Sequence, residues 1–202
     1  MSDDGVDEDK RETLRRFAAF GAAAPLAGLG SREAGTSDVR DAIVGYVART
    51  PGAHFSKVRD DLQLGTGETQ HHLRRLLDGG TLVSRRDGDY RRFYPADRFD
   101  SFEQVTLGFL RRETPRALLI ACLREPGRTG AALASALDVS RPTVSTTARA
   151  LAEAGLLDRE SGYRVVAPET VIKLLVRYAD SFDAAAAAFA DDVDDFVTYS
   201  QA

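Results

Sequence analysis

The sequence contains one pattern twice, and this internal repeat limits the choice of fold more than any other feature. A shift of 75 residues aligns residues 51–82 with residues 126–157 without a gap. The identical positions, numbered in the first copy, are Pro51, Gly52, Leu62, Arg74, Leu76, Gly80 and Leu82. Apolar positions agree where a core requires them, whereas the polar positions between them differ. We therefore expect one supersecondary unit to occur twice.

Each copy is predicted to form three helices followed by a hairpin. In the first copy, two helices separated by the Pro51-Gly52 turn lead to a third helix at 66–78, for which Thr66 is the expected cap. The strands of residues 81–95 then meet at Asp87-Gly88, a favoured hairpin turn. This arrangement is a winged helix-turn-helix (HTH). The predicted fold class is mainly α with small β-hairpin wings (α+β), with two such domains in tandem.

Charge is distributed unevenly along the chain. The 27 basic and 31 acidic residues give a net charge of −4, and the acids concentrate at the two ends. Residues 74–92 instead hold six arginines and three acids. Such a basic island can attract a polyanion even though the whole chain is acidic. The single cysteine, Cys122, excludes an internal disulfide and a Cys-rich zinc site.

The third helix of the first copy carries side chains suited to DNA. At about 100° per residue, most of its polar positions point away from the apolar side, with Gln70 and His72 on the flanks. Arginine and glutamine can form paired hydrogen bonds with guanine and adenine edges in the major groove. Glu68 has an alternative role, because a carboxylate near a helix N-terminus complements the helix dipole. The candidate DNA-binding residues of this helix are Thr66, Gly67, Glu68, Thr69, Gln70, His71, His72, Arg74 and Arg75.

The predicted wing adds four arginines on the two sides of its turn. They are Arg85, Arg86, Arg91 and Arg92. Such cations can reach phosphates or a narrow minor groove. The alternative is a solvated hairpin face that has no partner.

His71 and His72 are neighbours, which argues against a metal site. Adjacent residues on a helix lie about 100° apart, whereas a metal prefers ligands at i and i+4. His54 could approach them, but no carboxylate or thiol spacing completes a set. We expect no metal and no cofactor, with His71 either contacting DNA or packing. No Ser-His-Asp grouping, acid pair or phosphate loop stands out, so we do not expect an enzyme.

The second copy offers fewer cations at the equivalent positions. Its outward polar residues, which are also candidates for DNA binding, are Arg141, Thr143, Ser145, Thr146 and Arg149. Small hydroxyl groups can contact phosphates or bases, and they suit a protein interface equally well. The second wing is shorter and holds two arginines, which leaves its contact with DNA open.

These motifs carry a family resemblance. The first copy, with TPGAHFSKVRDDLQLGTGETQHHLRRLLDGG, resembles archaeal winged-helix transcription regulators. The second copy, with LDVSRPTVSTTARALAEAGLL, is similar to repressors of the MarR and ArsR type, in which a helix starting at SRPTVS reads DNA. The tandem order and the scarcity of lysine resemble regulators of salt-loving archaea. The resemblance implies a regulator that binds double-stranded DNA.

The N-terminal region leaves two interpretations open. Residues 13–30 place Arg15 and Arg16 before a weakly apolar run and resemble a twin-arginine export signal. Against export, the residues after the arginine pair are not a full match. The run is also too short to span a membrane, so no membrane segment is expected. Leu14 and Phe17 suit a helix packed on the body of the protein.

Four segments are predicted along the chain. They are an acidic N-terminal segment (1–37), a first winged HTH (38–99), a linker helix with a second winged HTH (100–166) and C-terminal helices (167–202). The last segment carries two apolar stripes: Ile172, Leu175, Val176 and Ala179, and then Phe189, Val193, Phe196 and Val197. These stripes can pack on the chain's own core or form a homodimer interface.

The sequence thus favours a cytoplasmic, homodimeric transcription regulator that binds specific double-stranded DNA. Helix 66–78 would lie in the major groove, and the wing at 81–95 would lie on the backbone or in the minor groove. The alternatives are a protein-interaction module of the transcription or replication machinery, a ligand-sensing repressor, and an exported protein. Binding to duplex DNA without added protein separates the first interpretation from the second.

Overall fold

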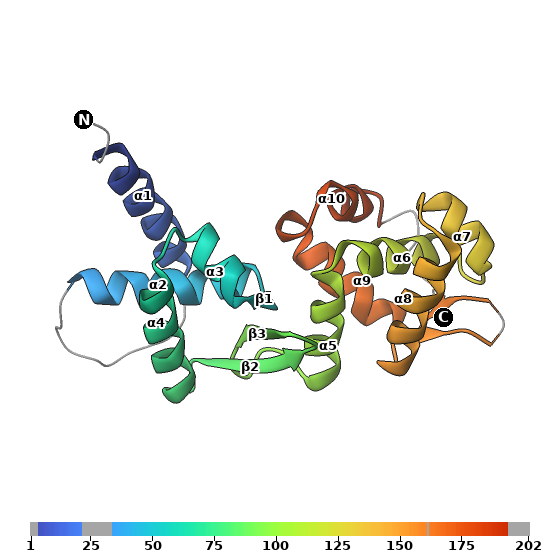
Figure 1. Cartoon of the computed structure of the whole chain (residues 1–202), viewed down its shortest axis with the longest axis horizontal. Helices are drawn as coiled ribbons and strands as arrows, with labels where there is room; N and C mark the ends of the chain where they lie inside the picture. The colour runs from blue at the N-terminus through green and yellow to red at the C-terminus, as the bar shows by residue number, and fades with distance from the viewer. Residues whose placement is uncertain (1–3, 22–33, 161, 194–202) are drawn as a thin grey trace, which may run out of the picture. The chain divides into compact units, whose positions relative to one another are not determined.

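The computed structural model describes residues 4–21, 34–160 and 162–193. The chain divides into two compact units, residues 1–100 and residues 101–202 (Figure 1). Each unit contains an HTH followed by an antiparallel hairpin. The predicted mainly α fold with two tandem winged HTH domains is therefore confirmed.

The first unit consists of helices and a small antiparallel sheet. Its helices are α1 (Asp4–Gly21), α2 (Ala34–Arg49), α3 (Phe55–Asp61) and α4 (Thr66–Asp78). Its strands are β1 (Ala53–His54), β2 (Leu82–Asp87) and β3 (Tyr90–Pro95), in the order β1-β3-β2. The wing is the β2–β3 hairpin, which follows α4 directly (Figure 1).

Apolar residues at helical spacing form the core of the first unit. Ile43 and Val47 of α2 belong to one buried cluster with Leu73 and Leu76 of α4, and Phe93 of the wing lies in the same cluster. Because the buried leucines of α4 are three residues apart, only one side of this helix faces the core. The opposite side of α4 is left in solvent.

Helix α1 packs against α2. Leu14 and Phe17 are partly buried against the core, and the Phe17 ring meets the Tyr46 ring edge to face at 5.3 Å between centroids. This is the packed helix that the sequence offered as the alternative to an export signal. Residues 22–30 of the signal-like stretch lie outside the described residues.

The second unit is helical with a very short hairpin. Its helices are α5 (Ser101–Leu110), α6 (Glu113–Arg124), α7 (Gly130–Ala136), α8 (Arg141–Glu153), α9 (Pro168–Arg177) and α10 (Ala184–Asp191), with a 3₁₀ turn η1 (Ala179–Ser181). Strands β4 (Leu157–Asp158) and β5 (Arg164–Val165) form its wing. Leu118, Leu133, Val144 and Leu151 are buried in its core.

Two helices, α5 and α6, lie between the two copies of the repeat. The helical segment breaks between α5 and α6 at Arg111 and Arg112, and Arg112 has an extended backbone (φ −104°, ψ 131°). The cause is Pro115, which lies in the first turn of α6. Proline has no N–H to donate to the carbonyl four residues earlier, and its ring clashes with that carbonyl.

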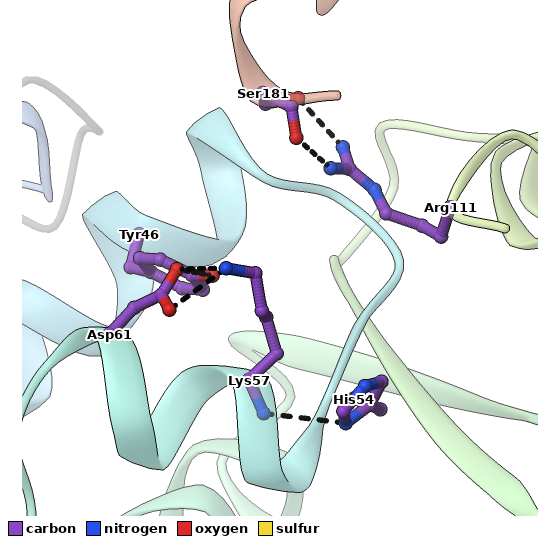
Figure 2. Close-up of polar contacts among 6 residues, drawn as sticks. All are labelled: Tyr46, His54, Lys57, Asp61, Arg111 and Ser181. Carbon is purple, nitrogen blue, oxygen red and sulfur yellow. Dashed lines mark hydrogen bonds and ion pairs between the residues drawn. The ribbon is translucent and has the colours of Figure 1, made fainter. Parts of the chain in front are cut away.

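The C-terminal helices pack mainly on their own unit. Val171, Leu174 and Leu175 of α9 are fully buried, whereas Val176 is 39% exposed. Arg116 of α6 pairs with Asp183. Arg111 donates hydrogen bonds of 2.7 and 2.9 Å to Ser181 (Figure 2). The predicted first stripe is therefore partly core. Phe196 and Val197 of the second stripe lie outside the described residues.

Cys122 of α6 is buried in this second core, with 1% of its surface exposed. Burial raises the pKa of its thiol to about 11.

None of the helices in the described ranges is long and apolar enough to cross a lipid bilayer.

Candidate nucleic-acid interface

The outer side of α4 carries exposed polar side chains. Gln70, His71, Arg74 and Arg75 are all exposed, as are Thr66 and Gly67 at the start of the helix. Arg74 lies 3.9 Å from Asp78, and both side chains are largely in solvent. Such an exposed pair contributes little to stability, so the Arg74 guanidinium is available to another anion.

Two of the predicted contact residues of α4 are instead buried. Thr69 is fully buried and its hydroxyl donates a 2.9 Å hydrogen bond to the carbonyl of Gly65. His72 is 4% exposed. Both residues lie on the helix side that carries Leu73 and Leu76, because positions i, i+3, i+4 and i+7 share one face. Their assignment to DNA contact is wrong.

Burial determines the charge of His72. It lowers the pKa of the imidazole, and the neighbouring side chains of His71, Arg40 and Arg75 lower it further. The Nδ1 atom has no hydrogen-bond partner among the described residues. His72 is therefore a neutral core residue.

The N-terminus of α4 is formed by Gly65 and Glu68. The expected cap, Thr66, is the first helical residue, and Gly65 occupies the N-cap position with an extended backbone. Glu68 accepts a 3.3 Å hydrogen bond from the Gly65 N–H and lies 3.5 Å from the Lys10 ammonium of α1. These contacts favour the helix-dipole role of Glu68 over a base contact. The role of Lys10 is not predictable from the sequence, because no pattern in it indicates how α1 docks.

The register of the wing divides its four arginines between two faces. Arg86 pairs with Arg91, and Arg85 pairs with Arg92. Directly opposed residues of a hairpin share a face, and alternate residues point to opposite faces. Arg86 and Arg91 therefore lie on the face that also carries Phe93, and Arg85 lies on the other face. These three arginines are exposed.

The fourth wing arginine, Arg92, is buried, with only 2% of its surface exposed. Its Nε pairs with Asp87 and its Nη1 donates a 2.9 Å hydrogen bond to the carbonyl of Gly52. The predicted phosphate contact is wrong for this residue. Its burial follows from the third strand, β1, whose His54 pairs directly with Arg92. A two-residue strand leaves no periodicity in the sequence, so the sequence does not predict it.

His54 joins the wing to helix α3. Its Nδ1 accepts a 3.3 Å hydrogen bond from the N–H of Lys57, which caps α3 (Figure 2). The ring also stacks on Tyr90 of the wing, with 4.8 Å between centroids. Burial lowers the pKa of His54, and the charges of Arg92 and Lys57 lower it further. His54 therefore acts as a neutral acceptor.

The C-terminal end of α3 is tied to α2 by a polar cluster. Asp61 accepts a 2.8 Å hydrogen bond from the Tyr46 hydroxyl and forms a 2.8 Å ion pair with Lys57 (Figure 2). No group of three His, Cys, Asp or Glu side chains within the described ranges is arranged to hold a metal ion.

A groove of about 560 Å³ lies between α4 and the wing. Gln70 and Arg74 of α4 and Arg91 of β3 line it, together with apolar side chains that include Leu77 and Phe93. The groove thus brings exposed polar groups from two separate predicted motifs onto one surface.

The second copy presents a less basic surface. Helix α8 is capped by Ser140, whose Oγ accepts a 3.2 Å hydrogen bond from the N–H of Thr143 and lies 2.7 Å from its hydroxyl. The Thr143 hydroxyl is therefore already engaged. Arg141, Thr143, Ser145, Thr146 and Arg149 are all exposed.

Comparison with known proteins agrees with this geometry. Residues 37–107 match the family of an N-terminal HTH domain, and residues 106–163 match the MarR family. The chain is a tandem HTH protein. The families that the tandem HTH protein resembles are transcription regulators rather than enzymes.

One curated relative is an uncharacterized HTH-type transcriptional regulator of Methanocaldococcus jannaschii. It is 26% identical to the tandem HTH protein over 131 residues, which are 64% of this chain and 33% of the relative. The chain thus spans about a third of the length of this relative. No solved structure is significantly similar to the tandem HTH protein.

Proposed function

We propose that the protein is a transcription regulator that binds specific double-stranded DNA with its first unit. Helix α4 lies in the major groove and the wing follows the backbone or enters the minor groove. The observation that carries the proposal is the groove in which Gln70 and Arg74 of α4 face Arg91 of the wing. One surface then offers groups that read base edges beside a cation that holds a phosphate.

Each exposed side chain has a separate role in this proposal. Gln70, His71 and Arg74 contact base edges in the major groove, and Arg75 adds a positive charge beside this groove. Arg85, Arg86 and Arg91 bind phosphates or line the minor groove, which strengthens binding to all sequences. Thr66 and Gly67, at the start of α4, come close to the backbone of the DNA.

The second unit binds DNA more weakly in this proposal. Its exposed Arg141, Ser145, Thr146 and Arg149 provide two cations and two hydroxyls, and α9 provides the surface for a homodimer. A dimer would read two half-sites, as is common for HTH proteins. A regulator of this kind works in the cytoplasm, where the chromosome of an archaeal cell lies. The abundance of aspartate and the shortage of lysine suit a salt-adapted cell.

Binding to bare duplex DNA tests the proposal. We expect the triple change Arg85→Ala, Arg86→Ala and Arg91→Ala to weaken binding to specific and random duplexes alike. It should reduce the slope of log affinity against log salt by up to about 0.9 for each phosphate that the variant no longer binds. Arg16→Ala removes an exposed arginine of α1 and serves as the control. A triple variant that matches the control in affinity and salt slope would show that the wing is a solvated hairpin.

Docking of another protein is the second candidate function, and it applies to the second unit. Val176 of α9 is 39% exposed, and the small hydroxyl groups of α8 are also exposed. Binding of the full chain to duplex DNA in the absence of any other protein favours the first function. Absence of duplex binding under low salt favours the second.

A further inference from the structure

Tyr90 is the most exposed large hydrophobic side chain in the described part of the chain. Half of its surface is in solvent. It begins β3, directly after the turn formed by Gly88 and Asp89. Because the ring lies at the tip of the hairpin, its exposed half is open to a partner that the wing approaches.

The ring of Tyr90 is held in a fixed position. It stacks on His54 at 4.8 Å with an angle of 30° between the rings, and the Arg92 guanidinium carbon lies 5.5 Å from its centroid. Arg92 is in turn fixed by Asp87 and by the carbonyl of Gly52. An aromatic side chain with few rotatable bonds that is already supported loses little entropy when it meets a partner.

Three exposed arginines lie on the same hairpin as this ring, and Asp87, which pairs with Tyr90 across the hairpin, forms an ion pair with Arg92. Arg85 lies on the same face of the hairpin as Tyr90, and Arg86 and Arg91 lie on the opposite face near the tip. All three arginines are exposed. A partner complementary to this surface carries regularly spaced negative charges, with apolar groups between them.

We propose that Tyr90 packs its exposed ring on a deoxyribose of duplex DNA beside the wing, while Arg85, Arg86 and Arg91 hold the flanking phosphates. The inference rests on the proposed function. A sugar offers an apolar surface but no sequence information, so Tyr90 strengthens binding to all duplexes equally. The contact releases no counterion, which separates it from the arginine contacts.

The first test compares Tyr90→Ala, Tyr90→Phe and the wild-type chain on the same duplex. Tyr90→Ala should weaken binding about fivefold to tenfold, which is the lower end of the range for aromatic side chains stacked on bases. The salt slope should not change. Tyr90→Phe, which keeps the ring, should bind within about twofold of wild type. Val166→Ala, at an exposed apolar position of the second unit, is the control.

The second test separates a direct contact from a bracing role. The sequence has no tryptophan, so Tyr90→Trp places a single fluorescent indole at this position. Duplex DNA should protect the indole from acrylamide and lower the quenching constant at least twofold. Equal quenching with and without DNA would show that Tyr90 only supports the wing, and the inference would be wrong.

Other outcomes separate this inference from the proposed function. If wild type binds duplex DNA and Tyr90→Ala binds like the Val166→Ala control, the inference fails and the proposed function stands. If wild type binds no duplex at low salt, both fail. Tighter binding of wild type to single-stranded DNA than to duplex, abolished by Tyr90→Ala, would mean that the ring stacks on bases instead.

Discussion

At the scale of single residues, Arg92 is a charged side chain that is buried inside a small domain. A buried guanidinium is tolerated only when its donors are satisfied. Asp87 and the carbonyl of Gly52 provide this for Arg92. Because Gly52 lies in the turn before α3 and Asp87 lies at the tip of the wing, Arg92 connects the two parts. The direction of the wing therefore depends on an internal ion pair.

Removing this arginine should destabilise the first unit. Arg92→Ala removes the guanidinium that pairs with the partly buried Asp87 and is expected to cost about 2 to 4 kcal/mol of the free energy of unfolding. Arg85→Ala removes the exposed arginine opposite it and should change stability by less than about 0.5 kcal/mol. Urea denaturation followed by circular dichroism measures both. Equal midpoints for the two variants would contradict the bracing role of Arg92.

Two histidines should make stability depend on pH. The pKa of His54 and the pKa of His72 are both lowered in the fold, mainly by burial. As pH falls below about 6.5, the unfolded chain takes up protons that the folded chain does not. Stability is therefore full above this pH, falls as pH drops toward the lowered pKa values, and then levels off for these groups.

The double variant His54→Asn and His72→Gln isolates this effect. We expect its urea midpoint to fall less between pH 7 and pH 5 than that of wild type. His71→Gln, which changes an exposed histidine, should keep the wild-type pH dependence. If the double variant and wild type lose the same stability over this range, other groups control the acid sensitivity.

At the scale of elements, the sequence predicted the long helices well and the short strands poorly. Helix α4 spans Thr66–Asp78 as expected. The burial of Thr69 and His72 could have been found, since they share the face of Leu73 and Leu76. Pro115 likewise marked the break before α6. Strand β1 has only two residues, and only contacts between distant segments define it.

The internal repeat supplies a matched pair for the reading helices. Arg74 of α4 and Arg149 of α8 occupy equivalent positions, and both are exposed. Arg74→Ala should cost about 1 to 3 kcal/mol on a preferred duplex, because it removes a hydrogen-bonding group that reads a base. Arg149→Ala should cost less than Arg74→Ala, because the second unit binds DNA more weakly in the proposal. Fluorescence anisotropy with the full chain measures both, and a larger loss of affinity for Arg149→Ala would make the second unit the reader.

At the scale of the whole molecule, the two copies have diverged in their outer surfaces while keeping similar cores. The first has six-residue wing strands with exposed arginines, and the second has two-residue strands. The second unit also contains α9 and α10, and the buried sides of these helices complete its core. We infer that the first unit reads DNA and the second mainly associates with another copy.

Self-association can be tested without disturbing the core. Deleting α9 would remove Val171 and Leu174 from the core and destabilise the unit. A substitution at an exposed position is therefore a better test. Val176→Glu places a charge on the exposed side of α9 and should weaken a homodimer at least about tenfold, since an unpaired charge would be desolvated in the interface. Val166→Glu is the control at another exposed valine. Light scattering that shows the same mass for Val176→Glu and wild type would place any interface elsewhere.

The buried thiol of Cys122 has a consequence for how the protein responds to oxidants. Oxidation starts from an accessible thiolate, and a thiol with a pKa of about 11 and 1% exposure is neither ionised nor reachable at neutral pH. Because the sequence contains no other cysteine, peroxide has no reactive sulfhydryl group through which to act. DNA affinity should therefore be the same before and after exposure to mild hydrogen peroxide, and signals of oxidative stress would have to reach this protein by another route.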